Sequence, residues 1–245
     1  KTTLTVLLII KLYGLASCRI KYYYVNQAMT WEEARSYCKT HFTSLSLFND
    51  DIEEQRFLEY AVNRTSDAWI GLYNYVFPFK GWMWTVGLPP TQDKWDVEEP
   101  QYNCAILPKG NQKLRTHDCA KTFPFFCMTV STFFLVQQNE SWEGALEYCR
   151  VHYDDLASPS SNISMLYALK NIAPVQTQHV WIGLRFLAGG WFWLSGDDLQ
   201  YKAWSSAGQP QCPAQNQRCA ALDNITKTWT PRDCEEKLSF LCATN

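Results

Sequence analysis

An internal repeat with a period near 110 residues restricts the folds open to this chain more than any other feature of the sequence. Trp69-Ile70-Gly71-Leu72 recurs as Trp181-Ile182-Gly183-Leu184, and Gly81-Trp82-Met83-Trp84 recurs as Gly190-Trp191-Phe192-Trp193. Solenoid repeats run about 20 to 50 residues, so a period this long suits two small domains that each close their own core. The sequence therefore predicts a tandem of two homologous domains.

The composition is that of a globular protein, with 47% hydrophobic and 19% charged residues in a chain of 245. Aromatic residues make up 15%, and because each buries a large area, a few of them can hold a compact domain together. The formal charge is −2, with acids and bases interspersed. Since no basic run provides a phosphate-binding footprint, we expect neither a nucleic-acid partner nor a polybasic membrane contact.

Ten cysteines, eight of them at repeating positions, indicate an oxidising compartment and a secreted protein. The N-terminal segment agrees, because Lys1 precedes an apolar run and small residues follow it up to Cys18. We expect residues 1–18 to be a signal peptide. A membrane anchor is the alternative, but it needs roughly 20 apolar residues, and the sequence contains no such segment.

Four Asn-x-Ser/Thr sequences fit a secreted protein, although each can also arise by chance. The predicted glycosylation sites are Asn63, Asn139, Asn162 and Asn224.

Each copy is predicted to begin with a strand and an amphipathic helix. In the first copy, residues 22–25 are an aromatic and β-branched run typical of a strand. Thr30 and Glu33 form a capping-box pattern, which predicts a helix with Trp31, Ala34, Arg35 and Cys38 on one face and the cysteine on the buried side. The second copy has the same spacing, with Trp142, Ala145, Leu146 and Cys149 on one face.

A second helix is expected to begin near Asp50 or Asp51, and its counterpart near Asn162. The apolar residues available to pack the first of these helices are Ile52, Phe57, Leu58, Ala61 and Val62. Those available to the second are Ile163, Leu166 and Leu169.

The Trp-Ile-Gly-Leu and Gly-Trp-x-Trp segments are predicted to be consecutive strands. Pro, Gly, Gln and Asp dominate residues 85–103 and 194–211 without an apolar period, so each copy is expected to carry a long loop. A loop of about twenty residues in a compact domain is usually functional. Each copy is expected to end in a hairpin, between residues 104–107 and 123–127 in the first and between 219–222 and 238–242 in the second.

The order of these features resembles the C-type lectin-like domain in both copies. The helix that carries Trp and Cys, the Trp-Ile-Gly-Leu strand, the Gly-Trp-x-Trp strand, the long loop and three closing cysteines follow one another over residues 20–245. The resemblance implies an α+β fold with two helices, small antiparallel sheets, a long loop and two disulfides per domain, and places the domains at residues 19–129 and 132–245. The tandem resembles multi-lectin proteins related to the macrophage mannose receptor, and whether the chain is complete or a piece of a longer receptor stays open.

The resemblance also implies the disulfides, since spacing alone does not choose among the connectivities. One bridge in each domain ties the first helix to the last strand, and the other lies beneath the long loop. The implied pairs are Cys38 with Cys127, Cys104 with Cys119, Cys149 with Cys242, and Cys219 with Cys234.

Sugar-binding members of the family hold a calcium ion in the long loop, with ligands from a Glu-Pro-Asn or Gln-Pro-Asp triplet, a nearby acid and a Trp-Asn-Asp triplet. The first copy has Glu99-Pro100-Gln101 and Leu114-Arg115-Thr116 at the two triplets, so that a cation and a hydroxyl replace two ligands. The second has Gln209-Pro210-Gln211 and Trp229-Thr230-Pro231. Because calcium takes six to eight oxygen ligands, we expect ligand binding without a metal or other cofactor.

Asp118 and Asp233 stand two residues out of register with the triplets, so they are not expected to replace the missing ligands. The residues predicted to bind the ligand are Trp95, Glu99, Gln101 and Arg115 in the first copy and Trp204, Gln209 and Gln211 in the second. The alternative is that the two tryptophans pack the loops and the glutamines are merely solvated.

Cys18 and Cys212 have no counterparts in the repeat. If Cys18 leaves with the signal peptide, Cys212 lacks a partner, and an odd thiol in a secreted protein suggests a disulfide-linked dimer. A bridge from Cys18 to Cys212 within one chain is the competing interpretation.

The sequence predicts a recognition protein for a carbohydrate or protein ligand and not an enzyme. The four histidines are scattered, and no metalloprotease, nucleophile-elbow or Cys/His motif is present, so no catalytic residue is predicted. The alternatives are a calcium-dependent lectin acting through the first domain, and a structural or decoy protein that binds no sugar.

Overall fold

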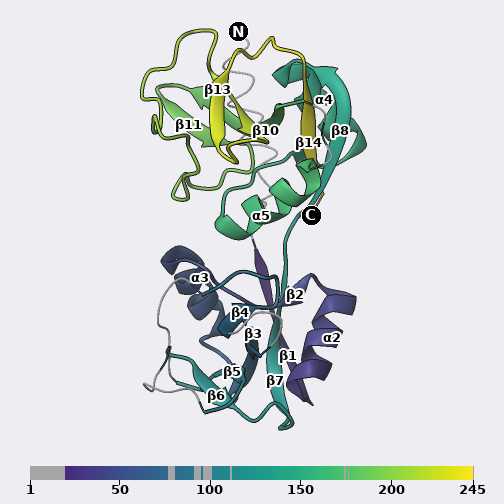
Figure 1. The fold of residues 1–245 in the computed structure, drawn as a ribbon, viewed down its shortest axis with the longest axis vertical. Helices are drawn as coiled ribbons and strands as arrows, with labels where there is room; N and C mark the ends of the chain where they lie inside the picture. The colour runs from purple at the N-terminus through teal and green to yellow at the C-terminus, as the bar shows by residue number, and fades with distance from the viewer. Residues whose placement is uncertain are drawn as a thin grey trace. The chain divides into compact units, whose positions relative to one another are not determined.

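The computed structural model describes residues 20–76, 81–90, 95, 101–110, 112–173, 175 and 177–244. Its described residues form two compact units, one from Ile20 to Thr129 and one from Val130 onward, which we call domain 1 and domain 2 (Figure 1). The predicted signal peptide, which includes Cys18, and the predicted ligand residue Glu99 lie outside the described residues.

The first helix of each domain begins at the expected tryptophan. In domain 1, α2 (Trp31–His41) starts from a complete capping box, because the Thr30 side chain accepts from Glu33 N and Glu33 accepts from Thr30 N. These hydrogen bonds from Thr30 hold the pKa of the Glu33 carboxyl below its ordinary value. In domain 2, Ser141 caps α4 (Trp142–His152), but Gly144 stands where domain 1 has Glu33, so only half of the box is present.

The second helix of each domain also begins as predicted. Asp50 caps α3 (Asp51–Ala61) by accepting from the backbone N–H groups of Ile52 and Glu53, and Ser161 caps α5 (Asn162–Ile172). The packing expected of Val62 is wrong, because this residue lies beyond the helix and its side chain is 70% exposed. Phe57 and Ala61 cover the core instead.

Each domain contains one sheet of seven strands with the same topology. In domain 1 the order is β1 (Lys21–Met29), β7 (Phe123–Thr129), β3 (Ala68–Tyr75), β5 (Cys104–Leu107) and β6 (Arg115–His117). In domain 2 it is β8 (Thr132–Glu140), β14 (Leu238–Thr244), β10 (His179–Leu187), β12 (Cys219–Asp223) and β13 (Trp229–Arg232). The short strands β2 (Ser44–Leu45) and β9 (Asp155–Leu156) pair with β7 and β14, and β4 (Gly81–Trp84) and β11 (Gly190–Trp193) pair with β3 and β10.

The expected closing hairpins are wrong in both domains. The last strand pairs with the first strand of its own domain and runs parallel to the Trp-Ile-Gly-Leu strand, so β7 joins β1 and β3 while β14 joins β8 and β10. The true hairpin partners of β5 and β12 are the short strands β6 and β13, which lie inside the connections that were read as hairpin loops. Those strands are only three and four residues long, too short to show a period of their own.

The glycine of each Trp-Ile-Gly-Leu strand lies where two backbone segments approach closely. A Cβ on Gly71 would stand 3.0 Å from the carbonyl oxygen of Leu45, and one on Gly183 would stand 2.8 Å from that of Leu156. In both domains the glycine N–H donates to the segment after the first helix, over 2.8 Å to Ser46 O and 2.7 Å to Ala157 O. A side chain at the glycine position would therefore prevent this close backbone contact between the strand and the segment after the first helix.

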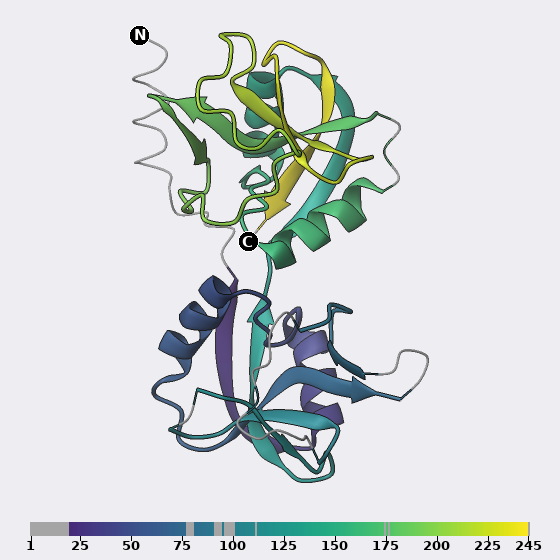
Figure 2. The same ribbon diagram turned by 60° about the vertical axis from the view of Figure 1, so that its left-hand side comes forward.

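Four disulfides close the two domains, and they pair the cysteines that the family resemblance implied. Cys38–Cys127 and Cys149–Cys242 join the first helix of each domain to its last strand. Cys104–Cys119 and Cys219–Cys234 lie beside β6 and β13. In Figure 2 the segment between β11 and β12 runs as an irregular ribbon, as expected of the long loop of domain 2.

Candidate functional site

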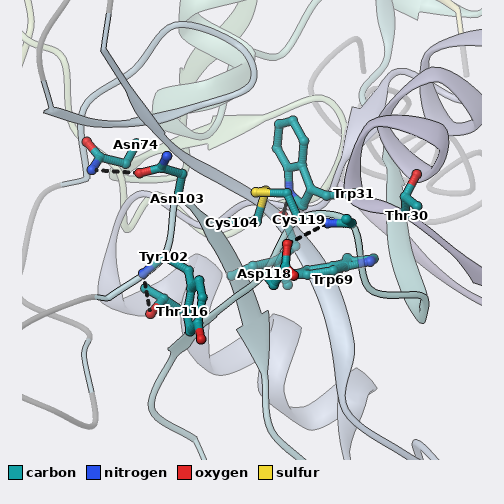
Figure 3. Close-up of a disulfide and its surroundings, with 12 residues drawn as sticks. Thr30, Trp31, Trp69, Asn74, Tyr102, Asn103, Cys104, Thr116, Asp118 and Cys119 are labelled. Atoms are coloured by element: carbon teal, nitrogen blue, oxygen red, sulfur yellow. Dashed lines mark hydrogen bonds between the residues drawn. A yellow bond between two sulfur atoms is a disulfide. The ribbon is translucent and has the colours of Figure 1, made fainter.

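In domain 1, the end of the long loop is fastened to the edge of the sheet by one hydroxyl. Thr116 Oγ1 on β6 accepts hydrogen bonds from the backbone N–H groups of Gln101 and Tyr102, at 3.1 and 3.2 Å, and Figure 3 shows the bond from Tyr102. A hydroxyl oxygen has two lone pairs, so both are engaged by the loop backbone. Thr116 occupies the position at which the family resemblance places a calcium-binding carboxylate, and here it serves as a clamp for the loop.

An exposed group of polar and aromatic side chains surrounds this clamp. Tyr102 is 49% exposed, and its ring lies parallel to that of His117, with centroids 6.1 Å apart. Gln101 and Arg115 are also exposed. Together Gln101, Tyr102, Arg115 and His117 form a surface, called here the loop-end surface, that combines a cation, an amide and an aromatic face.

Sequence reasoning selected Gln101 and Arg115 for this surface but missed Tyr102. The signal was present, since Tyr102 directly follows the predicted Gln101. What was missing was the pairing of Cys104 with His117 across β5 and β6, which brings residues 102 and 116 together. His117 is half-buried and packs edge-on against Phe123, with ring centroids 4.8 Å apart.

The predicted ligand residues Trp95 and Trp204 each belong to a pair of tryptophans whose rings are in contact and tilted to one another. Trp82 and Trp95 have centroids 4.4 Å apart, and Trp191 and Trp204 have centroids 4.8 Å apart. Each loop tryptophan also forms an isolated bridge with the sheet edge, Trp95 with Leu114 and Trp204 with Trp229. Both residues therefore pack the loops, and their contact with a ligand stays a prediction.

In domain 2 the loop triplet is held by the same tryptophan pair. Trp191 Nε1 donates to the carbonyl oxygen of Pro210 at 2.8 Å, which places Gln209 and Gln211 on either side of a fixed proline. Gln211 is exposed, whereas Gln209 is half-buried. At the sheet edge, Thr230 Oγ1 donates to Ala221 O at 3.4 Å, and Pro231 carries no side-chain oxygen.

The two aspartates beside the disulfides cap turns. Asp118 Oδ1 accepts from Ala120 N at 3.0 Å, and Asp233 Oδ1 accepts from Glu235 N at 3.1 Å. Figure 3 shows Asp118 beside the Cys104–Cys119 bridge, with this turn contact drawn. Both aspartates thus order the chain next to a disulfide.

Among the residues that the structure describes, no three His, Cys, Asp or Glu side chains lie close enough together to form a metal site. Thr116 engages both lone pairs with the loop, and Arg115 adds a positive charge beside it. These residues do not fit a calcium ion, because the metal needs several free oxygen donors.

A buried ionisable pair lies in domain 2, between β10 and β12. His179 Nε2 stands 3.5 Å from Asp223 Oδ2. Burial, and then the nearby Arg232 guanidinium, lower the pKa of His179, although the Asp223 carboxylate acts in the opposite direction. Burial alone would raise the pKa of Asp223, but hydrogen bonds from Ile225 N, Thr226 N and the Gln178 amide outweigh it and lower that pKa.

Comparison with known proteins agrees with this architecture. The family model described as the lectin C-type domain matches residues 27–129 and 138–244. The chain is 22% identical to the secretory phospholipase A2 receptor of Mus musculus over 92% of its length, and 23% identical to lymphocyte antigen 75 of Homo sapiens over 88%. It spans only 18% and 14% of those two relatives.

Human lithostathine superposes with a TM-score of 0.41 and 24% identity, covering 46% of this chain and 90% of that one. The two family matches coincide with the two halves of the repeat, and together they span most of the chain. This chain therefore belongs to the C-type lectin domain family, and it carries two such domains in tandem.

Proposed function

We propose that this chain is an extracellular recognition module which binds a glycan or protein ligand through the loop-end surface of domain 1 without calcium. The observation that carries the proposal is the engagement of Thr116 Oγ1 by Gln101 N and Tyr102 N. Because these two N–H groups donate to this hydroxyl, the end of the loop is held by its own backbone contacts. A surface that is ordered without a metal can bind its ligand in the presence of a chelator.

The chemistry of the loop-end surface suits a polar ligand with acceptor groups. Arg115 supplies guanidinium donors, Gln101 supplies an amide, and the ring of Tyr102 offers a flat face with a hydroxyl at its edge. Aromatic and arginine side chains are the residue types that contribute most to recognition surfaces. We assign this domain pair a binding role and not a catalytic one.

A binding assay with and without calcium tests the proposal. The chain is applied to a printed glycan array and to extracellular protein candidates, once in millimolar calcium and once in chelator. Wild-type binding should be equal in the two buffers, and Tyr102→Ala or Arg115→Ala should weaken it about tenfold or more, the loss of one good contact. Val151→Ala, a change at a residue of α4 in domain 2 that is 70% exposed and lies outside the predicted ligand residues, is the control and should retain full binding.

A calcium-dependent lectin acting through domain 1 is the rival function. Calorimetric titration distinguishes the two, because calcium binding in the micromolar to millimolar range would establish the rival and contradict our proposal. Loss of ligand binding in chelator would also support the calcium-dependent lectin and contradict our proposal.

The extracellular location is supported by the four disulfides, which persist in oxidising compartments. The relatives named above include a receptor, so we propose either a secreted chain or the ectodomain of a longer receptor. In the part of the chain that the structure describes, every helix is too short or too polar to cross a bilayer.

We also propose a dimer linked through Cys212, which is exposed and forms no disulfide with any described residue. Gel electrophoresis without reductant should show a band at twice the chain mass, and reductant should remove it. The Cys212→Ser variant should run as a monomer in both lanes. A wild-type monomer without reductant would contradict the dimer and favour a bridge within one chain.

A further inference from the structure

Both domains contain a cavity at the same place, away from the loop triplets. It lies between the first turn of the first helix, the end of the Trp-Ile-Gly-Leu strand and the third cysteine of the domain. In domain 1 it is lined by Trp31, Glu32, Arg35, Tyr73, Tyr75 and Cys119 among others, with a volume of about 530 Å³. In domain 2 the volume is about 510 Å³, with Glu143, Arg185 and Cys234 in the corresponding positions.

The floor of the domain 1 cavity is held rigidly by hydrogen bonds. Trp31 N donates to Cys119 O at 3.2 Å, and its indole Nε1 donates to Ile70 O at 2.9 Å. The disulfide from Cys119 to Cys104 fixes the same corner to β5. A ligand would therefore meet a preformed surface, which reduces the ordering cost of binding.

The walls of this cavity are aromatic. Tyr73 and Tyr75 project from the same face of β3, because side chains two residues apart in a strand share a face. Tyr73 lies 4.9 Å from the Trp31 ring and 4.8 Å from the Tyr75 ring, centroid to centroid. Gly81 stands opposite Tyr75 in the register, and a Cβ there would meet nothing within 4 Å. Among the described residues, which leave out 77–80, the space at this point of the strand pair is therefore open.

A polar pair borders the aromatic walls. Arg35 Nη1 lies 2.9 Å from Glu32 Oε1, with the two side chains 39% and 66% exposed. The Arg35 guanidinium also lies 6.0 Å from the centroid of the Trp31 ring. An ion pair this exposed contributes little to stability, so its donors and acceptor can turn toward a ligand at small cost.

We propose that this cavity of domain 1 is a second binding site, separate from the loop-end surface, and that it takes a neutral sugar ring without metal. A sugar ring has an apolar C–H face that packs on the tyrosine rings, and hydroxyls that both donate and accept. These hydroxyls can donate hydrogen bonds to Glu32 and accept them from Arg35. A purely apolar group would desolvate the ion pair between Glu32 and Arg35 without offering it hydrogen bonds. An anion would be repelled by the Glu32 carboxylate, and a cation would have to displace Arg35 from Glu32.

The cavity of domain 2 has lost this chemistry, which makes it an internal control. Arg185 replaces Tyr73 and lies 4.6 Å from the Trp142 ring, and it forms an ion pair of 2.6 Å with Glu143. Leu187 and Ala188 stand where domain 1 has Tyr75 and Val76. The acid that corresponds to Glu32 is therefore paired with a residue of the cavity wall itself, and the lining residues include Phe186 but neither of the two tyrosines of domain 1.

The test measures sugar binding by matched variants of the full chain. A printed array of neutral and charged glycans, probed in chelator, identifies the glycans bound by the wild type. Tyr75→Ala and Glu32→Gln should each weaken binding of a neutral glycan at least tenfold, whereas Tyr75→Phe, which keeps the ring, should weaken it about three- to tenfold. Glu143→Gln, the equivalent change in domain 2, should leave it unchanged. Thermal melts of all four variants establish that they are folded.

The outcomes separate this site from the loop-end surface. Binding that is lost in Tyr75→Ala but retained in Tyr102→Ala supports the cavity, while the reverse pattern supports only the loop-end surface and overturns the cavity. Absence of any neutral glycan from the bound set, with or without binding to a protein, also overturns it. Saturation-transfer NMR with the bound glycan should show ring C–H protons receiving magnetisation from the protein, and signals confined to another part of the glycan would contradict the stacking.

Discussion

At the scale of single residues, the glycine of the repeated tetrapeptide is explained by contact with backbone atoms and not by a turn. Gly71 and Gly183 lie within extended strands, each facing carbonyl oxygens of the segment after the first helix. Gly183 N donates to Ala157 O, and Gly183 O accepts from Leu194 N at 2.8 Å. The repeat therefore retains glycine at a point where the sheet and the connecting segments exchange hydrogen bonds.

Replacing this glycine should destabilise the domain that contains it. In Gly183→Ala the new methyl would lie 2.8 Å from Leu156 O and 2.9 Å from Ser158 Oγ, so the backbone must shift. Overpacking of this kind costs about 1 to 3 kcal/mol of unfolding free energy, measured by denaturant titration. The exposed Val62→Ala serves as a control and should change little. An unchanged denaturation midpoint in Gly183→Ala would contradict this prediction, because it would show that the backbone moves away from the new methyl without loss of stability.

His179 should make the stability of domain 2 depend on pH. Its pKa is lowered in the folded state, first by burial, so the unfolded chain takes up a proton at a higher pH than the folded chain does. Well above pH 6.5, the ordinary pKa of histidine, protonation of His179 does not change the free energy of unfolding. As the pH drops below 6.5 toward the lower pKa of the folded state, the free energy of unfolding falls. His179→Gln should flatten the unfolding free energy between pH 7 and 5. An equal slope in variant and wild type would exclude His179 as the cause.

At the scale of secondary-structure elements, local sequence signals predicted the helices correctly, whereas the pairing of strands that are distant in the sequence was predicted wrongly. The capping pattern from Thr30 to Glu33 and the spacing of Trp31 and Cys38 gave the start and the buried face of α2 correctly. The last strand was paired wrongly because its true partner, β1, lies about a hundred residues away and sequence period does not encode partners. The loop-end surface was found only in part for the same reason.

The two disulfides of a domain should differ in their contribution to stability. Cys149–Cys242 spans 93 residues and Cys219–Cys234 spans 15, so the chain-entropy model gives about 4 to 5 and about 3 kcal/mol. Calorimetric melts of the paired alanine variants should therefore show the larger loss for Cys149→Ala with Cys242→Ala. If removal of the Cys219–Cys234 bridge causes the larger loss of stability, then its role in holding Cys234 O against Trp142 N outweighs the effect of loop closure.

At the scale of the whole molecule, the chain is two self-contained units. Each seven-stranded sheet, each disulfide and each hydrophobic cluster of the described residues lies inside one domain. The duplication has left the core positions alike, such as Trp31 and Trp142, while changing the cavity residue from Tyr73 to Arg185. The two domains therefore share their core residues and differ in the residues that line this cavity.

Because no element is shared, each domain should fold by itself. Residues 20–129 and 130–245, produced separately in an oxidising compartment, should each form two disulfides and unfold cooperatively, as small single domains usually do. Mass spectrometry checks the bridges, and calorimetry checks the transitions. If domain 1 folds only when domain 2 is attached, the two domains do not fold independently and the prediction is wrong. Separate folding would let the two cavities be compared in isolated domains, with the sugar binding confined to residues 20–129.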